Sequence, residues 1–144
     1  MQINIFYKTK ISPYYHKTGI YRRAILHALG KQAKRQSELN VFVVSPQEML
    51  RINTKYLGHK YITDVITFPY PQTGLKGEVF GDIIVCFYQA KKQAPEAKTS
   101  TLLEFLILMV HGALHLVGYD DNTLELRNKM NVLARSIAEQ ALKS

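Results

Sequence analysis

If the stretch from Leu102 to Val117 forms a helix, that helix is apolar on nearly every side, and this feature constrains the fold more than any other part of the sequence. Such a helix has to be buried on several sides, so the rest of the chain must surround it. The stretch nevertheless contains His111 and His115, and unpaired polar groups are costly in a buried place. One histidine there would most simply be a hydrogen-bonded core residue. Two histidines at i and i+4 lie on one helix face, with Cβ atoms about 5–6 Å apart, and can bind one metal ion.

The residues that follow the second histidine strengthen the metal interpretation. Gly118 stands where a helix can end in the left-handed conformation that glycine tolerates. The chain can then fold back and bring Asp121 to the same ion. Three protein ligands and one open position are typical of a catalytic zinc site. Asp120 is an alternative third ligand. It could instead cap the turn, or orient one of the metal ligands without binding the ion itself.

The ligand spacing also occurs in a class of zinc proteases, but their catalytic base is missing. The pattern His-x3-His-x2-Gly-x2-Asp equals the metzincin spacing with Asp in place of the third His. These proteases need Glu directly after the first His as general base. The chain has Gly112 at that position, which argues against peptide hydrolysis.

Charge points to a different class of partner. Nineteen Lys and Arg against eleven Asp and Glu give a net charge of +8, and the first carboxylate of the chain is Glu38. Such a one-signed field attracts polyanions, so we expect contact with nucleic acid. A solvated helix face without a partner is the alternative.

Length and composition favour one cytoplasmic domain over residues 1–144. The single cysteine, Cys86, excludes an intrachain disulfide and suits a reducing compartment. The amino terminus lacks the apolar core of a signal peptide. The longest strongly apolar run, residues 105–110, is far shorter than the roughly 20 residues that a membrane span needs. We therefore expect no membrane contact.

Hydrophobic periodicity predicts an α/β fold built as an α+β layer, with a four-stranded mixed sheet, about five helices and a zincin-like metal helix. Alternating or continuous apolar runs predict strands at 2–7, 39–44, 63–68 and 78–87. Sequence patterns predict helices at 14–36, from the Ser45 cap to about residue 56, and at 88–94 up to Pro95. The stretch that is apolar nearly all round predicts a further helix at 102–117. The helix at 102–117 has a possible capping box at Thr101 or begins a turn earlier, and Asn122 is the expected cap of the last helix.

The chain resembles a known family in three segments. Residues 111–121 read His-Gly-Ala-Leu-His-Leu-Val-Gly-Tyr-Asp-Asp, and they match the signature His-Gly-x-Leu-His-Leu-x-Gly-Tyr-Asp-His of the YbeY family at every fixed position except the last. Residues 63–69, Thr-Asp-Val-Ile-Thr-Phe-Pro, and 81–86, Gly-Asp-Ile-Ile-Val-Cys, resemble two further family segments. The likeness covers nearly the whole chain in order.

This resemblance implies a metal-dependent endoribonuclease that acts on single-stranded RNA, in rRNA maturation (16S rRNA processing) and ribosome quality control. His111, His115 and Asp121 would hold one Zn²⁺ per chain, and a metal-bound water would be the nucleophile. No side chain is identified as a catalytic base. The implied partners are rRNA and the small ribosomal subunit, and the oligomeric state is not indicated.

Two positions depart from the family pattern. Asp121 stands where the family usually has a third His ligand. Leu57 follows Tyr56 where the family usually has an Arg that is thought to face the substrate phosphate. Lys60 and His59 lie nearby and are the expected substrate-binding replacements for that cation.

Three classes of function follow, with the metal-dependent ribonuclease first. The second is a non-catalytic ribosome- or rRNA-associated factor in which the metal is structural, and the missing Arg supports it. The third is a metal-dependent hydrolase of another substrate, peptides included.

Overall fold

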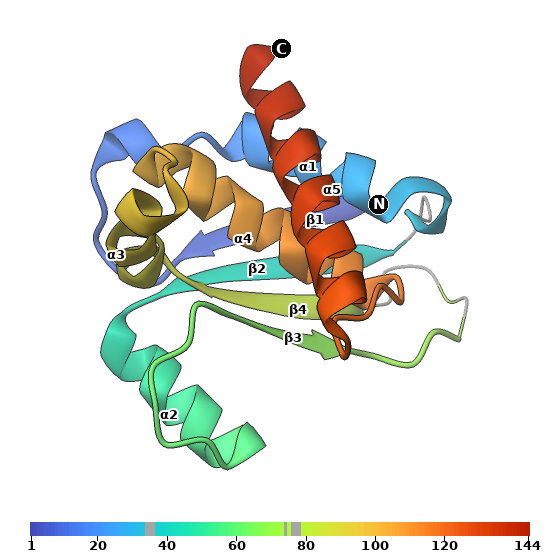
Figure 1. Cartoon of the computed structure of the whole chain (residues 1–144). Coiled ribbons are helices and arrows are strands. Elements are labelled where there is room, and N and C mark those ends of the chain that lie inside the picture. The colour runs from blue at the N-terminus through green and yellow to red at the C-terminus, as the bar shows by residue number, and fades with distance from the viewer. Residues whose placement is uncertain (34–36, 74, 76–78) are drawn as a thin grey trace.

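Four strands form one mixed sheet in the computed structural model, which describes residues 1–33, 37–73, 75 and 79–144. The strands are β1 (Gln2–Tyr7), β2 (Glu38–Val44), β3 (Val65–Pro69) and β4 (Val79–Cys86), in the spatial order β1-β2-β4-β3 (Figure 1). β1, β2 and β4 run parallel, and β3 pairs antiparallel with β4 at the edge. The predicted four-stranded mixed sheet is therefore confirmed.

In the described part of the chain, five α-helices pack around the sheet, as the sequence predicts. They are α1 (Thr18–Leu29), α2 (Pro46–Leu57), α3 (Phe87–Ala97), α4 (Thr101–Leu116) and α5 (Leu124–Lys143), and the 3₁₀ turns η1 (Pro13–Tyr15) and η2 (Gly30–Gln32) flank α1. In Figure 1, α1, α4 and α5 lie on one side of the sheet and α2 lies on the other. The fold is α+β.

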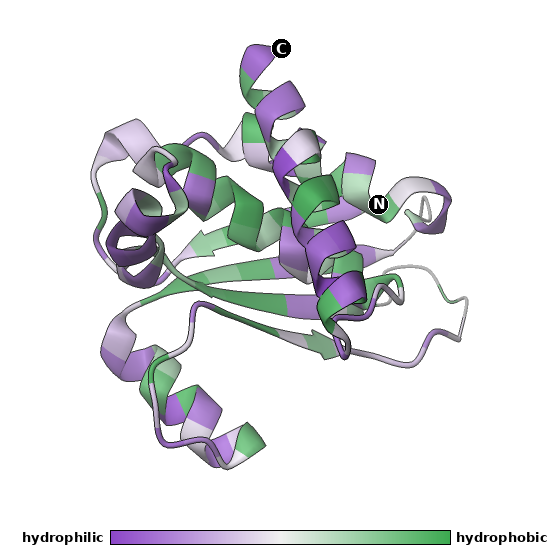
Figure 2. Cartoon of the chain, viewed as in Figure 1, coloured by the Kyte–Doolittle hydropathy of each residue, from purple (hydrophilic) through white to green (hydrophobic). Residues whose placement is uncertain are grey.

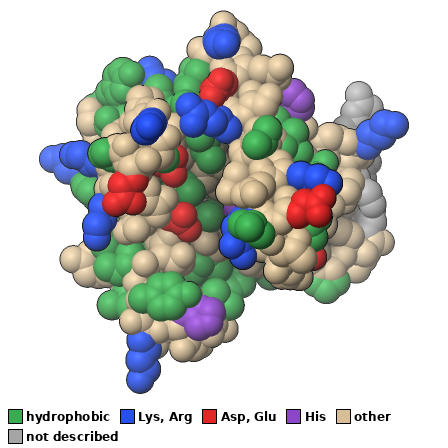
Figure 3. Space-filling view, viewed as in Figure 1, with side chains coloured by type: hydrophobic (Ala, Val, Ile, Leu, Met, Phe, Trp, Pro, Cys, Tyr) green, Lys and Arg blue, Asp and Glu red, His purple; other side chains and the backbone are tan. Residues whose placement is uncertain are grey.

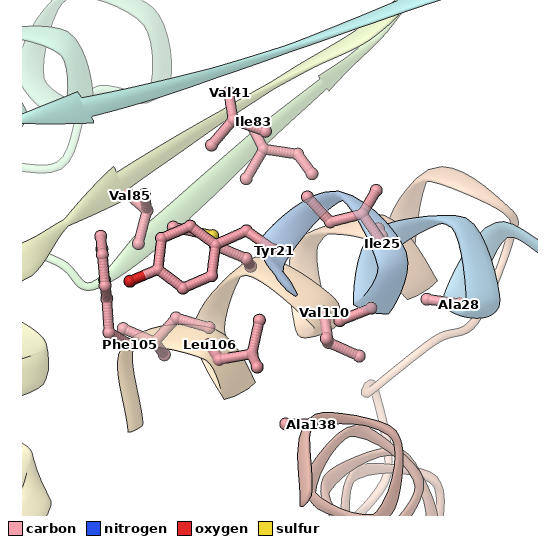
Figure 4. Close-up of a cluster of buried hydrophobic side chains, with 14 of the residues drawn as sticks. Tyr21, Ile25, Ala28, Val41, Ile83, Val85, Phe105, Leu106, Val110 and Ala138 are labelled. Atoms are coloured by element: carbon pink, nitrogen blue, oxygen red, sulfur yellow. The ribbon is translucent and has the colours of Figure 1, made fainter. Parts of the chain in front are cut away.

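Helix α4 is the centre of the larger hydrophobic core, and colouring by hydropathy shows it as a mainly apolar helix (Figure 2). Its Phe105, Leu106 and Val110 are fully buried. They pack with side chains from α1, α5 and the facing strands, among them Tyr21, Ile25, Val41, Ile83 and Ala138 (Figure 4). Burial on several sides is what the uniformly apolar sequence of this helix requires.

Glycine lets α4 approach the sheet closely at the level of the two histidines. A Cβ atom added to Gly112 would lie 2.9 Å from Ile83 Cγ2 and 3.2 Å from Thr67 Cγ2. A Cβ atom added to Gly81 on β4 would lie 2.7 Å from a methyl carbon of Leu116. The residue after the first histidine therefore faces the sheet, where a larger side chain would collide with Ile83 and Thr67.

Helix α2 covers part of the opposite sheet face with a second, smaller cluster of buried residues. The cluster contains Val44, Met49, Ile52, Ile66, Ile84 and Cys86. Ser45 begins the helix as predicted, because its side chain accepts a hydrogen bond from Glu48 N. Gly58 ends it in the left-handed conformation, with φ 71°.

The prediction of one long helix over 14–36 was wrong. α1 covers only Thr18–Leu29 because Gly30, with φ 56°, turns the chain out of the helical conformation. Tyr14 and Tyr15 belong to the separate turn η1. The last part of the predicted helix, residues 34–36, lies outside the described residues, as does residue 78 at the start of the predicted fourth strand.

Three local predictions near other helix ends also need correction. Pro95 does not break α3, which continues to Ala97, because this exposed proline lies in the last turn and removes only one backbone donor. α4 is capped by Ser100, one residue before the predicted capping box. α5 is capped by Thr123 and not by Asn122, which donates hydrogen bonds to Asp120 instead.

Among the described residues, no single helix is long and apolar enough to cross a membrane; α3 and α4 pass that test only as a pair, and they are bent by 111° relative to each other.

Candidate metal centre

Helix α4 and the turn that follows it bring two histidines and one carboxylate together. His115 Nε2 lies 3.5 Å from Asp121 Oδ2, and His111 Nε2 lies 3.9 Å from the same oxygen. The two imidazole rings are 4.8 Å apart between centroids, as expected for i and i+4 on one helix face. The three side chains are partly buried, with 17%, 27% and 39% exposure for His111, His115 and Asp121.

The separation of these ligand atoms fits a small tetrahedral cation. Zinc binds histidine nitrogen and carboxylate oxygen at about 2.0–2.2 Å, which places two ligand atoms of a tetrahedron about 3.4 Å apart. One ligand atom from each residue can be chosen so that all three lie within 4.8 Å of one another. The two histidine–carboxylate distances, 3.5 and 3.9 Å, are already close to the separation in a tetrahedron. The group could therefore bind a metal ion.

The turn after α4 places the third side chain as the sequence predicts. Gly118 adopts φ 99°, a conformation that is costly for residues with a Cβ atom. Asp120, the alternative ligand, is exposed and accepts hydrogen bonds from Asn122 N at 2.6 Å and Asn122 Nδ2 at 3.0 Å. It therefore closes the turn, and Asp121 is the carboxylate that lies beside the histidines.

The surroundings of His111 favour its neutral form. Burial is the largest cause that lowers the pKa of His111 below its ordinary value, and the neighbouring His115 lowers it further. The carboxylates of Asp64 and Asp121 act in the opposite direction, but they do not cancel the lowering. Because metal ions bind the neutral imidazole, this environment keeps the histidine ready for a metal at neutral pH.

A chain of hydrogen bonds ties Asp64 to the buried part of α4. Gln93 Nε2 lies 3.3 Å from Asp64 Oδ2 and 3.3 Å from Glu104 Oε2. Asp64 Oδ1 also accepts a hydrogen bond from Val65 N at 2.8 Å. This fixes a carboxylate beside His111 without making it one of the three grouped ligands. A lone carboxylate such as Glu104 in an otherwise apolar helix was the sequence signal for such a network.

A cavity of about 380 Å³ opens at the three grouped residues. His59, one of the two predicted substrate-binding residues, lies on its wall, and so does Leu57, but Lys60 does not. Tyr61 also lines the cavity, and it was not predicted because nothing local connects it with residues far along the chain. The whole lining is Asn53, Leu57, His59, Tyr61, Thr63, Asp64, Val65, Ile66, Thr67, His111, His115 and Asp121.

A larger hollow of about 830 Å³ lies on the α2 side of the sheet, lined by residues that include Phe42, Arg51, Phe68 and Asp82. In the described part of the chain, His111, His115 and Asp121 form the only group of three His, Cys, Asp or Glu side chains that lie close enough together to hold one metal ion. Asp82 lines this second hollow and is not part of the metal group. Figure 3 shows cationic side chains spread singly over the visible face, with no single basic patch.

An α+β fold with two histidines and a carboxylate in the wall of a polar cavity suits a hydrolase that uses a metal ion. Comparison with known proteins specifies the class. The family described as Endoribonuclease YbeY matches residues 8–142. The chain therefore belongs to the YbeY family of RNA-cleaving hydrolases, as its motifs predicted.

Individual relatives agree with this family. The chain is 44% identical over 133 residues to the endoribonuclease YbeY of Elusimicrobium minutum, covering 91% of this chain and 93% of the relative. It is 34% identical over 133 residues to that of Petrotoga mobilis, covering 90% and 88%. A Thermotoga maritima protein solved in solution has the same fold, with a TM-score of 0.65 and 22% identity over 99% of this chain and 92% of that one.

Proposed function

We propose that this protein is a zinc-dependent endoribonuclease that cleaves single-stranded RNA during rRNA maturation, including 16S rRNA, and ribosome quality control. The observation that carries the proposal is the placement of His111, His115 and Asp121 in the wall of the 380 Å³ cavity. Family membership supplies the substrate class, and the net charge of +8 agrees with a polyanionic substrate.

His111, His115 and Asp121 would hold the ion, and the cavity side would remain open for substrate. When bound, zinc supplies Lewis-acid chemistry, since it lowers the pKa of water towards about 7 and polarises a phosphoryl oxygen. The residues of this chain prepare that chemistry. α4 holds the two imidazoles at fixed spacing, and Asp64 places a fixed negative charge beside His111.

We further propose that the protein is one cytoplasmic domain that acts on rRNA at the small ribosomal subunit. The basic composition and the single buried cysteine support this placement. Lys60, which is exposed outside the cavity lining, is proposed to contact the RNA backbone. If so, Lys60→Ala weakens RNA binding and makes it less dependent on salt; unchanged binding and cleavage would remove Lys60 from the proposal.

A second candidate is a non-catalytic rRNA-binding factor with a structural metal. One observation favours it, namely that Leu57 lines the cavity at the position where a family arginine is expected. The described residues that line the cavity then include no lysine or arginine that could face a phosphate group of the RNA.

Metal analysis combined with RNA cleavage separates the two candidates. The purified chain should contain about one zinc per molecule and cleave a single-stranded RNA, and His115→Ala should lose both zinc and cleavage while keeping the circular dichroism of the wild type. His27→Ala is the matched control, because His27 is exposed on α1 and outside the metal group. Zinc and RNA binding without cleavage by the wild type would support the non-catalytic factor instead.

A further inference from the structure

The wall of the metal cavity contains aromatic side chains, whereas a ribonuclease would be expected to have cationic side chains there to contact RNA phosphates. Its lining, among the described residues, contains no lysine or arginine, and it contains the carboxylates of Asp64 and Asp121. The side chains at its outer wall are instead Leu57, His59 and Tyr61. Contact with substrate at this wall therefore has to use ring faces and apolar surface more than charge.

His59 and Tyr61 form a stacked pair on this wall. Their ring planes lie within 10° of parallel, with centroids 5.4 Å apart, and Tyr61 Oη lies 3.4 Å from His59 Nδ1. Tyr61 is nevertheless 56% exposed, so the pair is not covered by other side chains. An exposed stack of two flat rings leaves an outer face on which a third flat ring can pack.

The segment that carries this pair is held rigidly to the end of α2. Gly58 turns the chain with φ 71°, and His59 N then donates to Asn53 O at 3.2 Å. Asn53 is 1% exposed, and its Nδ2 donates to Tyr61 O at 2.9 Å. Thr54 Oγ1 lies 3.3 Å from His59 O. The backbone that carries the two rings is therefore fixed before any ligand arrives, which reduces the entropy lost on binding.

We propose that Tyr61, backed by His59, stacks on an unpaired base of the RNA and so positions the strand across the metal cavity. This inference rests on the proposed ribonuclease function and names Tyr61 as a positioning residue for the same site. Single-stranded nucleic acids are commonly held by base–aromatic stacking, since every base has a flat face. A base in a duplex is already stacked and paired, so this wall selects single-stranded RNA.

The test is a double-mutant cycle between Tyr61 and one base of the ligand. The probe is a single-stranded RNA of about eight adenosines, within the usual size of single-strand sites, with an abasic nucleotide at each position in turn. Affinity is measured by fluorescence anisotropy in a chelator, so that the strand is not cleaved. In the wild type, one abasic position should weaken binding about tenfold. In Tyr61→Ala, which itself binds the intact RNA about tenfold more weakly, the same abasic position should have almost no further effect.

Three comparisons separate stacking from a hydroxyl contact, from a general loss of aromatic surface and from a phosphate contact. Tyr61→Phe should bind like the wild type, because it keeps the ring and loses only the hydroxyl group. Tyr14→Ala should show an undiminished abasic effect, since Tyr14 is similarly exposed, at 59%, but does not line the metal cavity. The weakening in Tyr61→Ala should be equal at low and high salt, whereas loss of a phosphate contact would lower the salt slope by about 0.7.

The possible outcomes distinguish a failure of the stacking inference from a failure of the proposed ribonuclease function. If the wild type cleaves RNA but Tyr61→Ala shows the full abasic effect at every position, the stacking inference is overturned and the ribonuclease stands. If the wild type neither binds nor cleaves single-stranded RNA, both fail. If Tyr61→Phe binds as weakly as Tyr61→Ala, the hydroxyl group and not the ring face makes the contact, and stacking is again excluded.

Discussion

Replacing Gly112 by alanine should loosen α4 from the sheet, even though alanine is the better helix former. The added Cβ atom would lie 2.9 Å from Ile83 Cγ2 and 3.2 Å from Thr67 Cγ2. Ile83 is fully buried, and its Cγ2 is attached directly to Cβ, so the methyl group cannot turn away without a change of rotamer. The helix, the strand or both must shift.

The expected size of the effect is the difference between two opposing contributions. Alanine in place of glycine inside a helix stabilises by about 1 kcal/mol, whereas overpacking a well-packed core costs about 1–3 kcal/mol. Because the contact is with a branched, buried side chain, we expect a net loss of about 1 kcal/mol in the free energy of unfolding. This corresponds to a fall of roughly 3–5 °C in Tm for a chain of this size.

Urea unfolding of a double-mutant cycle measures the contact itself. Ile83→Ala alone should cost about 2–5 kcal/mol, but it removes both γ carbons that a Cβ atom at residue 112 would meet. In that background Gly112→Ala should therefore stabilise, with a coupling of about 2 kcal/mol. Gly19→Ala on α1 is the control, because nothing lies within 4 Å of its added Cβ atom, and it should not destabilise.

Two results would refute this reasoning. One is a Gly112→Ala variant at least as stable as Gly19→Ala, and the other is strict additivity of Gly112→Ala with Ile83→Ala. A functional measurement follows from the same geometry. Since His111 directly precedes Gly112, a displaced helix should also bind zinc more weakly than the wild type does, as measured by competition with a chelating dye.

Three further predictions concern the metal centre. Zinc at a hundred times its Kd should stabilise the wild type by about 2.7 kcal/mol in thermal unfolding, and His115→Ala should lose this gain; an equal gain in both would place the zinc elsewhere. Folding lowers the pKa of His111. As pH falls below 6.5, the unfolded state therefore takes up the proton before the folded state does. The metal-free chain should then lose stability, by up to about 1.4 kcal/mol per pH unit for this one group. Urea midpoints of His111→Gln should therefore change less with pH over this window, and parallel curves would contradict the assignment. Finally, an anionic Asp121 leaves less net charge on the ion than a neutral histidine would, so Asp121→His should shift the pH–rate profile of RNA cleavage to lower pH; superimposable profiles would show that the ligand does not tune the reaction.

The metal group could be predicted from sequence because all three side chains come from one short segment. Helix periodicity relates His111 to His115, and Gly118 supplies the turn that brings Asp121 back. Both relations are local, and local geometry is what sequence spacing encodes. The central position of α4 followed equally directly from a stretch that is apolar on all sides.

The opposite wall of the cavity could not be predicted in the same way. Tyr61 and Asn53 meet the metal group only because β3 is the edge strand beside α4, and this depends on the strand order of the whole sheet. The end of α1 was also missed, because the amphipathic pattern continues past Gly30 while the backbone does not. Periodicity reports which face of a segment is apolar, but it does not locate the residue at which the segment stops.

The three metal-binding candidates are held with very different firmness. His111 and His115 belong to a helix seated against the sheet at Gly112 and Gly81, so neither imidazole can move far without repacking the core. Asp121 lies on a surface turn closed by Asp120 and Asn122. In evolutionary terms, the histidine pair can be rearranged only together with the core, whereas the third position is free to vary alone. A lineage can therefore change which ion it uses, or how reactive that ion is, through point changes in one exposed turn.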